Sequence, residues 1–341
     1  MKKDILNFTL VELKKEILKM NEASHRADQI FLGLYKKRVD KFNAITTLSK
    51  NLILKLDEKF TIGSLICEKR LMSKDKSEKF LFKTKDDQYL ETVLIKEKTR
   101  RTVCVSTQIG CKYKCRFCAS GLNGFIRNLT VSEITGQILL AGRLSPEKIT
   151  NVVFMGMGEP LDNYENVKKA VFLINDSKAM GVGARKITIS TCGIIPGIKK
   201  LMDIGVQVEL SVSLHAADEA LRNKLVPVNE KYPLKDLIKT CREYYAKTHR
   251  IITLEYILIK DQNDSVQDAD KLALIANKIR AKVNLIKCND FRGLECIGSD
   301  QRKVISFRDR LIKQRVKVTI RKSRGEDILA ACGQLAAKMD Q

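Results

Sequence analysis

Three cysteines lie within eight residues near the end of the first third of the chain. Cys111, Cys115 and Cys118 form a C-x3-C-x2-C motif in GCKYKCRFCAS. Thiolates at this spacing on one loop can share one metal centre, and a four-iron cluster normally takes four cysteines. Three protein ligands would leave one iron open for a substrate or cofactor. The motif therefore predicts an open [4Fe-4S] cluster, with a zinc site completed by a distant ligand or three unrelated thiols as alternatives.

The compartment and the solubility class follow from the cysteine usage and from hydropathy. The chain has ten cysteines, and in a reducing compartment these indicate metal binding or catalysis more than structural disulfides. No apolar run approaches the ~18 residues that a membrane-spanning helix needs. The start of the sequence has no apolar stretch typical of a signal peptide. We therefore expect a cytoplasmic protein without a membrane partner.

Short apolar segments alternate with helical patterns from about residue 100 onward. Such alternation predicts an α/β fold whose parallel sheet is covered by helices, and about six units indicate a full or partial β/α barrel. In such barrels the chemistry lies at the C-terminal ends of the strands. The expected strands are 151–156, 186–191, 206–213, 251–258, 282–286 and 316–320.

The part of the chain before the alternation divides in two. Residues 1–60 carry apolar positions at helical spacing, and Thr9 with Glu12 forms a capping-box pattern, so we expect a small helical accessory domain. Residues 61–96 change to the short β-rich segments of hairpin strands and are expected to form a connector. The barrel would then occupy residues 97–341.

The net charge of +23 favours a polyanionic partner. Its excess of Lys and Arg is spread over the whole chain, so no basic tail accounts for it. RNA or DNA is the first candidate for such a field. A solvated surface with many lysines explains the charge equally well.

The cysteine motif followed by β/α alternation resembles the radical S-adenosylmethionine (SAM) superfamily. Phe117, directly before the last cysteine, is also typical of that superfamily. Further motifs along nearly the whole chain resemble the RlmN/Cfr family of ribosomal RNA adenine methyltransferases. They are, in order, ADQIFLGLY, YLETVLI, CVSTQIGCKYKCRFCASGLNGFIRNLTVSEI, NVVFMGMGEPL, ITISTCGIIPGI, SLHAADEALRNKLVPVN and AACGQLA.

This resemblance implies a fold and an activity. The fold is a partial (β/α)6 barrel with an N-terminal helical domain and a C-terminal loop that carries a catalytic cysteine. The activity is methylation of carbon 2 of adenine 2503 in 23S rRNA and of adenine 37 in tRNA. Each turnover uses two molecules of SAM, and the electron comes from a donor protein such as a flavodoxin or ferredoxin. We expect the enzyme to be a monomer.

Three residues outside the cluster motif match the family's reacting groups. Cys332 matches the cysteine that carries the methyl group, Cys104 the resolving thiol that forms a transient disulfide with it, and Glu91 the proton acceptor. A carboxylate can act as a base if burial raises its pKa towards neutrality. Without the resemblance, Cys104 would be read as a core residue, Cys332 as a packed helix residue and Glu91 as a surface charge.

The resemblance also implies the residues that contact SAM. Glu159 can take the ammonium group of SAM, and the glycines before it let the backbone approach a ligand. His215 alone would more often be a hydrogen-bonded core histidine. The implied contacts are Gly158, Glu159, Ser190, Ser213, Leu214, His215 and Asn289.

One departure and two alternatives stay open. The family commonly has Asn-Pro where this chain has Asn289-Asp290, so the rim can differ there. Pro160 after Glu159 favours carbon 2, whereas Cfr-type enzymes, which methylate carbon 8, tend to have Ala. A non-catalytic, zinc-stabilised RNA-binding protein is the alternative from another class. The cysteines without an assigned role are Cys67, Cys192, Cys241, Cys288 and Cys296.

Overall fold

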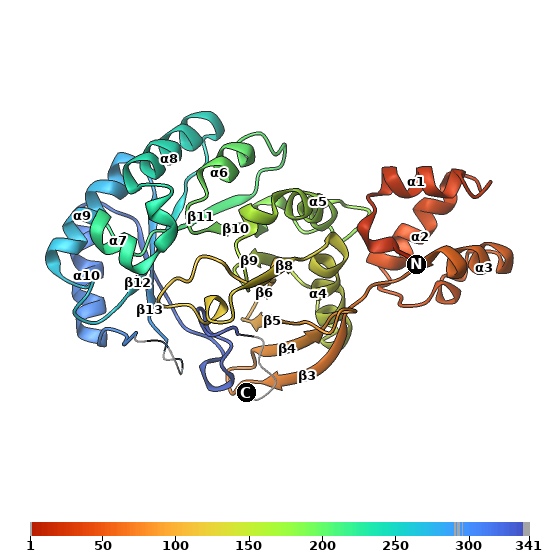
Figure 1. Ribbon diagram of the computed structural model, residues 1–341, viewed down its shortest axis with the longest axis horizontal. Helices are drawn as coiled ribbons and strands as arrows, with labels where there is room; N and C mark the ends of the chain where they lie inside the picture. Colours follow the sequence, from red (N-terminus) through yellow and green to blue (C-terminus); the bar gives the residue numbers. More distant parts are fainter. Residues whose placement is uncertain (1, 290, 292–293, 295, 337–341) are drawn as a thin grey trace.

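Ten strands form one continuous curved sheet, as the computed structural model shows for residues 2–289, 291, 294 and 296–336 (Figure 1). Seven neighbouring strands are parallel, which agrees with the near-continuous apolar runs of the sequence. In sheet order they are β6 (Arg101–Cys104), β9 (Asn151–Phe154), β10 (Ile187–Thr191), β11 (Glu209–Ser213), β12 (Thr253–Leu258), β13 (Lys282–Lys287) and β14 (Val318–Arg321).

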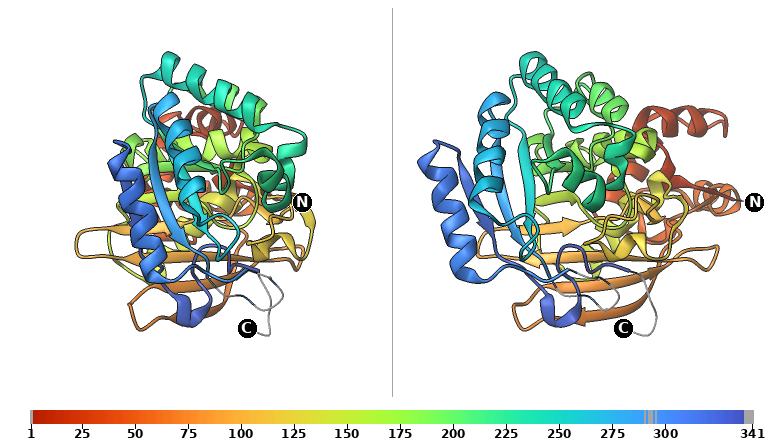
Figure 2. Two further views of the ribbon diagram at one scale, coloured as in Figure 1. Left: turned by 90° about the vertical axis from the view of Figure 1, so that its left-hand side faces the viewer. Right: turned by 60° about the vertical axis from the view of Figure 1, so that its left-hand side comes forward.

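Helices cover the outer face of the parallel strands (Figure 2). Six strands from β6 to β13 are each followed by at least one helix, and β14 adds a seventh parallel strand. The predicted partial (β/α)6 barrel is therefore confirmed. The helices are α4 (Val131–Leu144), α5 (Tyr164–Asn175), α6 (Ile195–Leu201), α7 (Glu219–Leu225), α8 (Leu234–Thr248), α9 (Val266–Lys278) and α10 (Gln301–Lys313).

Three antiparallel strands extend the same sheet beyond β6. They are β3 (Ile66–Met72), β4 (Glu78–Lys83) and β5 (Tyr89–Lys96), and β5 pairs directly with β6. The phenylalanines of β4 are buried in the main core, whereas β3 is the mostly exposed edge. The strands predicted between residues 61 and 96 thus continue the barrel sheet.

The N-terminal helices form a small layer against α4 and α5 (Figure 1). The predicted capping box is confirmed, because Thr9 Oγ1 accepts from the Glu12 N–H and the Glu12 carboxylate accepts from the Thr9 N–H. The division of the chain at residues 60 and 96 stays a prediction. The elements are β1 (Lys3–Asp4), α1 (Leu10–Leu18), α2 (His25–Tyr35), α3 (Lys50–Lys59) and β2 (Phe60–Thr61).

The chain after β14 crosses back to the antiparallel strands. The Gly325 N–H donates to Asp75 at 3.0 Å, and Lys79 on β4 donates to the Leu329 carbonyl at 3.2 Å. The Ser73 hydroxyl also donates to Asp327 at 2.6 Å. Together with the bond from the Ala336 N–H to Glu91 on β5, these contacts hold residues 325–336 against the antiparallel strands.

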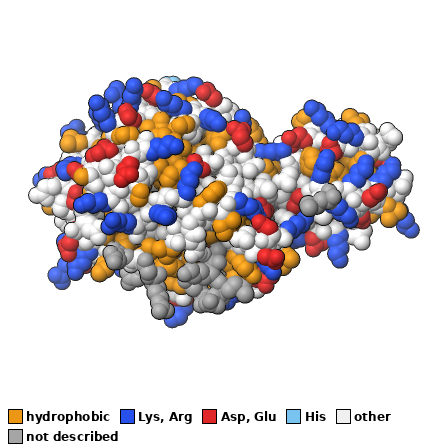
Figure 3. All heavy atoms as spheres, in the orientation of Figure 1, with side chains coloured by type: hydrophobic (Ala, Val, Ile, Leu, Met, Phe, Trp, Pro, Cys, Tyr) orange, Lys and Arg blue, Asp and Glu red, His pale blue; other side chains and the backbone are white. Residues whose placement is uncertain are grey.

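Lys and Arg side chains are scattered over both the N-terminal helices and the barrel on the face shown in Figure 3. This distribution agrees with the even spread of charge along the sequence. Within the described part of the chain, every helix is too short or too polar to cross a bilayer.

Candidate active site

The three-cysteine motif lies on a loop between two short paired strands, β7 (Gln108–Gly110) and β8 (Phe125–Asn128). Gly110 has a φ of +71°, and a Cβ there would lie 1.8 Å from the Gly124 carbonyl oxygen. The Cys111 N–H donates to that same oxygen at 2.9 Å. Only glycine therefore permits the two ends of the loop to meet closely.

The three thiols turn towards one cavity, while the basic residues between them are exposed. Cys111, Cys115 and Cys118 line the cavity, which encloses about 880 Å³ of space with its open mouth included. We call it the barrel cavity. Lys112, Lys114 and Arg116 alternate with the cysteines and are exposed to solvent.

The donor set fits a polynuclear centre. Burial raises the pKa of Cys111 to about 12 and also raises the pKa of Cys115 and Cys118, so thiolates there need a positive centre beside them. Among the described residues, no three Cys, His, Asp or Glu side chains are gathered closely enough to hold a single metal ion. A four-iron cluster holds its thiolates farther apart than one ion does, so three thiols around one cavity suit it.

Glu159 presents a buried carboxylate to the barrel cavity. It is 4% exposed, and its oxygens accept hydrogen bonds from the N–H groups of Leu161 (3.0 Å) and Cys192 (2.8 Å). Burial raises its pKa above the ordinary value despite these bonds. Gly158 has a φ of +93°, and a Cβ there would lie 2.5 Å from Gln108. The turn therefore requires glycine and aims Glu159 inward.

Ser190 and Ser213 line the same cavity from the ends of β10 and β11. His215 also lines it, with its ring 4.4 Å from the Phe117 ring. The Ile257 N–H donates to His215 Nδ1 at 3.1 Å, and burial lowers the pKa of the histidine to about 3. His215 is thus both a hydrogen-bonded core residue and a neutral wall of the cavity.

Two residues among the expected SAM contacts, Leu214 and Asn289, do not line the barrel cavity. Leu214 is 1% exposed, and its side chain does not line the barrel cavity. Asn289 lines a second, adjoining cavity instead. Its Nδ2 donates to the Cys332 carbonyl at 3.1 Å and its Oδ1 accepts from the Ser323 hydroxyl at 2.7 Å. Asp290, the departure next to Asn289, lies outside the described residues.

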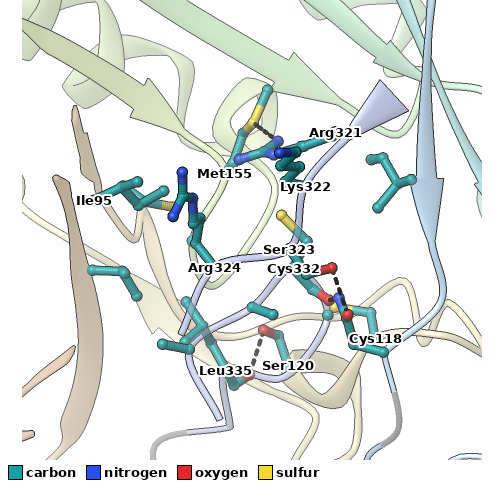
Figure 4. A pocket seen from close by; sticks show the side chains of 18 residues that line it. Ile95, Cys118, Ser120, Met155, Arg321, Lys322, Ser323, Arg324, Cys332 and Leu335 are labelled. Carbon is teal, nitrogen blue, oxygen red and sulfur yellow. Dashed lines mark hydrogen bonds between the residues drawn. The ribbon is translucent and has the colours of Figure 1, made fainter. Parts of the chain in front are cut away.

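Cys104 and Cys332 both line a second cavity, which we call the thiol cavity. Figure 4 labels Cys332 within it. Cys104 ends β6, whereas Cys332 lies on the loop after β14 and not on a helix. Cys332 lines both cavities. It therefore shares one cavity with Cys104 and the other with the loop that carries Cys111, Cys115 and Cys118. The residues common to both cavities are Cys118, Met155, Gly156, Ile286, Arg321, Cys332 and Gly333.

Glu91 is buried beneath the Cys332 loop. Its carboxylate pairs with Lys79 at 2.9 Å and accepts the Ala336 N–H at 2.8 Å. It lines neither the barrel cavity nor the thiol cavity. Glu91 is therefore not the surface charge that its strand position alone would indicate, and the loop covers it in this state.

The structure also adds residues that the sequence did not single out. Cys192 and Glu255 line the barrel cavity, and Arg321 lines both cavities. The sequence contains a signal for Glu255, because it is the one charged residue within the largely apolar segment IITLEYIL. For Arg321 the sequence offered no pattern, because its position depends on how β14 meets the C-terminal loop.

The remaining cysteines differ in state. Cys288 and Cys296 form a disulfide, which departs from the expectation that the cysteines serve metal binding or catalysis more than structural disulfides. Cys104 and Cys332 are free thiols. Cys241 is buried on α8, and Cys67 is partly buried on β3. Neither Cys241 nor Cys67 lines the two cavities.

Two protein-family models match the chain. The model of the radical SAM superfamily matches residues 105–273, and the model of the ribosomal RNA large subunit methyltransferase N-terminal domain matches residues 3–62. The first match contains the three-cysteine loop and both serines of the barrel cavity. The second contains the N-terminal helices.

Curated relatives match over nearly the full length. A probable dual-specificity RNA methyltransferase RlmN from Clostridium novyi is 45% identical, with 98% of this chain and 97% of the relative covered. The protein of the same name from Caldicellulosiruptor saccharolyticus is 43% identical, with 99% and 98% covered. The crystal structure of a radical SAM methyltransferase from Sphaerobacter thermophilus matches with a TM-score of 0.96 and 38% identity, covering 98% of this chain and 100% of that one.

The superfamily implies a [4Fe-4S] cluster and SAM, for which the barrel cavity offers three thiols and a buried carboxylate. The alternative of a non-catalytic zinc protein is wrong, because the proteins that match this chain over nearly its whole length are methyltransferases. The chain belongs to the RlmN family of radical SAM methyltransferases.

Proposed function

We propose that this enzyme methylates carbon 2 of adenine, at adenine 2503 of 23S rRNA and at adenine 37 of tRNA. The observation that carries the proposal is the pair of adjoining cavities that share Cys332. A cysteine that faces SAM on one side and a substrate base on the other can receive a methyl group and pass it on. The relatives are named as dual-specificity RNA methyltransferases, and this supports the choice of RNA.

Carbon 2 of adenine lies between two ring nitrogens and is not a nucleophile, so direct transfer from SAM is disfavoured. The bound cluster and a second SAM supply the radical chemistry that this carbon needs. We propose Cys111, Cys115 and Cys118 as cluster ligands and Gly158, Glu159, Ser190, Ser213 and His215 as the groups around SAM. Glu159 would pair with the ammonium group of SAM. Contacts from Leu214 and Asn289 stay predictions.

Three side chains then act on the methyl group and the base. The Cys332 sulfur takes a methyl group from the first SAM, which leaves as S-adenosylhomocysteine. Glu91 accepts the proton that carbon 2 loses. The Cys104 thiolate then attacks the Cys332 sulfur, and the S–S bond forms as the bond from Cys332 to the transferred carbon breaks. The electron pair of that broken bond passes to the carbon attached to adenine, which takes up a proton to complete the methyl group. Since Glu91 lies beneath the Cys332 loop, we propose that this loop shifts when the base enters.

The remaining parts of the proposal concern the partners. The basic surface would hold the phosphates of the RNA. Such contacts fix the position of the RNA but do not read its base sequence. An acidic one-electron donor such as a flavodoxin or ferredoxin would reduce the cluster. We propose that the enzyme acts as a monomer in the cytoplasm, which sedimentation at working concentration tests.

Methylation by the anaerobically reconstituted enzyme with labelled SAM tests this function. Transcripts of 23S rRNA and tRNA are digested, and mass spectrometry identifies the methylated atom. We expect 2-methyladenine; 8-methyladenine would replace the proposal by the Cfr-type alternative. Pro160, which lines the barrel cavity beside Glu159, supports carbon 2.

The matched variants are Cys332→Ala and Cys67→Ala. Cys332→Ala should abolish RNA methylation while iron content stays near four per chain. Cys67→Ala removes a thiol that lines neither cavity and should keep turnover. Normal turnover by Cys332→Ala would contradict the proposed route.

A further inference from the structure

A lysine on β4 is buried beside the proposed proton acceptor. Lys79 lies opposite Val93 in the register of β4 and β5, two positions along from Glu91. Opposite residues of an antiparallel pair share one face of the sheet, so Lys79 is a diagonal neighbour of Glu91. Its ammonium lies 2.9 Å from Glu91 Oε1, and both side chains are buried.

The face of the sheet that carries this ion pair also borders the thiol cavity. Val93 and Ile95 follow Glu91 at every second position of β5, so the three side chains share one face. Val93 and Ile95 line the thiol cavity, where Figure 4 labels Ile95. The pair of Lys79 and Glu91 therefore lies next to this cavity along the same face.

The two oxygens of the Glu91 carboxylate have partners of different kinds. Oε1 pairs with Lys79 inside the sheet, whereas Oε2 accepts the Ala336 N–H from the Cys332 loop at 2.8 Å. Lys79 also donates to the Leu329 carbonyl of that loop at 3.2 Å. A shift of the loop breaks the bonds to Leu329 and Ala336 but leaves β4 paired with β5. The ion pair therefore outlasts the loop contacts.

We propose that Lys79 is a positioning residue that holds Glu91 by Oε1 while Oε2 takes the carbon-2 proton of adenine. The proposal rests on the proposed function, in which Glu91 is the proton acceptor. The hydrogen leaves carbon 2 as a proton, its bonding pair stays on the adenine ring, and Oε2 gains the proton. Lys79 keeps its own protons, and its charge compensates a buried carboxylate that is costly to leave unpaired.

Methylation of RNA whose adenine carries deuterium at carbon 2 tests the proposal. In Lys79→Met, 2-methyladenine should form about tenfold or more slowly, with a larger isotope effect than in wild type, because proton removal becomes rate-limiting. Until the bond from Cys332 to the transferred carbon breaks, RNA and protein stay joined, so an adduct should accumulate on denaturing gels. Iron content and methylation of Cys332 precede proton removal and should be unchanged.

A double-mutant cycle separates positioning from a purely structural role. Because Lys79 acts through Glu91, adding Lys79→Met to Glu91→Gln should cause no further loss of residual product. The double variant has neither buried charge, so its folding does not suffer from an unpaired carboxylate. A further loss in the double variant would overturn the proposal. An unchanged isotope effect in Lys79→Met, or a loss of Cys332 methylation, would overturn it too.

Lys83→Met is the matched control. Lys83 lies on the same face of β4, but it pairs with the exposed Asp87 at 2.8 Å and lines neither cavity. This variant should keep the wild-type rate and isotope effect. If wild-type enzyme forms no 2-methyladenine, the proposed function is wrong and this inference falls with it. If wild type forms it and Lys79→Met is neither slower nor accumulates an adduct, only the inference is wrong.

Discussion

The Ala119 N–H, one residue after Cys118, donates a 2.7 Å hydrogen bond to the carbonyl of Gly333, one residue after Cys332. The Ser120 hydroxyl repeats this connection with the Leu335 carbonyl at 2.7 Å. Two loops that are far apart in the sequence are thus joined backbone to backbone. These bonds hold the backbone beside Cys332 against the backbone beside Cys118.

Gly333→Ala should uncouple these loops. Gly333 has a φ of +86°, and a Cβ there would lie 2.6 Å from the Phe117 carbonyl oxygen. Such strain costs about 1–3 kcal/mol and can be relieved only by moving one loop. We expect RNA methylation to fall by about tenfold or more while iron content is unchanged, as measured with labelled SAM and by iron analysis.

The control for this variant is Gly183→Ala, because no heavy atom lies within 4 Å of a Cβ built at Gly183. It should keep wild-type turnover. Undiminished methylation by Gly333→Ala would mean that the close approach to Phe117 does not position Cys332.

The strands were predictable because they are buried on both faces. The expected segments 186–191, 251–258 and 282–286 agree with β10, β12 and β13 to within two residues. The edge strand β3 was not singled out, because its residues are mostly exposed and show no apolar alternation. The β7–β8 pair was too short for any periodicity to indicate it.

The sequence predicts site residues only where they belong to motifs that resemble those of the family. The resemblance to the family implies the roles of Cys104 and Cys332, and both residues line one cavity. Burial of Glu91 under the C-terminal loop, the place of Asn289 beside Cys332 and the position of Arg321 depend on contacts between distant segments. No local pattern encodes such contacts.

Asn289→Ala distinguishes a role in holding the Cys332 loop from a direct contact with SAM. Asn289 lines the thiol cavity and bonds to Cys332 and Ser323, so its loss should loosen the Cys332 loop. Neutral hydrogen bonds contribute about 0.5–1.5 kcal/mol each. We expect RNA methylation to fall roughly threefold to tenfold with unchanged affinity for SAM in equilibrium dialysis.

Asn277→Ala is the matched control, since its amide bonds to the Gln314 carbonyl and neither residue lines the barrel cavity or the thiol cavity. It should change neither quantity. A loss of SAM affinity in Asn289→Ala would instead support the SAM contact that the sequence resemblance implies.

Arg222→Met should destabilise the ends of β10 and β11. Arg222 is fully buried, and its guanidinium donates to the carbonyls of Cys192, Ser213 and Leu214. Each unsatisfied buried acceptor costs about 1–3 kcal/mol, so we expect the free energy of unfolding to fall by at least about 3 kcal/mol. Urea unfolding under anaerobic conditions measures this change. Arg242→Met, on the exposed side of α8, should be neutral, and equal stability of the two variants would contradict the role of Arg222.

SAM binding should weaken as the pH falls, because Glu159 must be ionised to pair with the ammonium group of SAM. Burial raises the pKa of Glu159, so this carboxyl takes up a proton at a higher pH than an exposed glutamate does. Affinity should therefore be full at pH 8 and decline as the pH falls through this raised value. Equilibrium dialysis of labelled SAM with holoenzyme from pH 8 down to about pH 5 measures the decline.

Glu159→Gln keeps the shape but not the charge, so it should bind SAM about tenfold or more weakly at pH 8 and show no such decline. Glu165→Gln removes an exposed carboxylate of α5 that does not line the barrel cavity, and it should retain the wild-type profile. A pH dependence that persists in Glu159→Gln would assign the titrating group to another residue of the barrel cavity, with Glu255, whose pKa burial also raises, as the next carboxyl to replace.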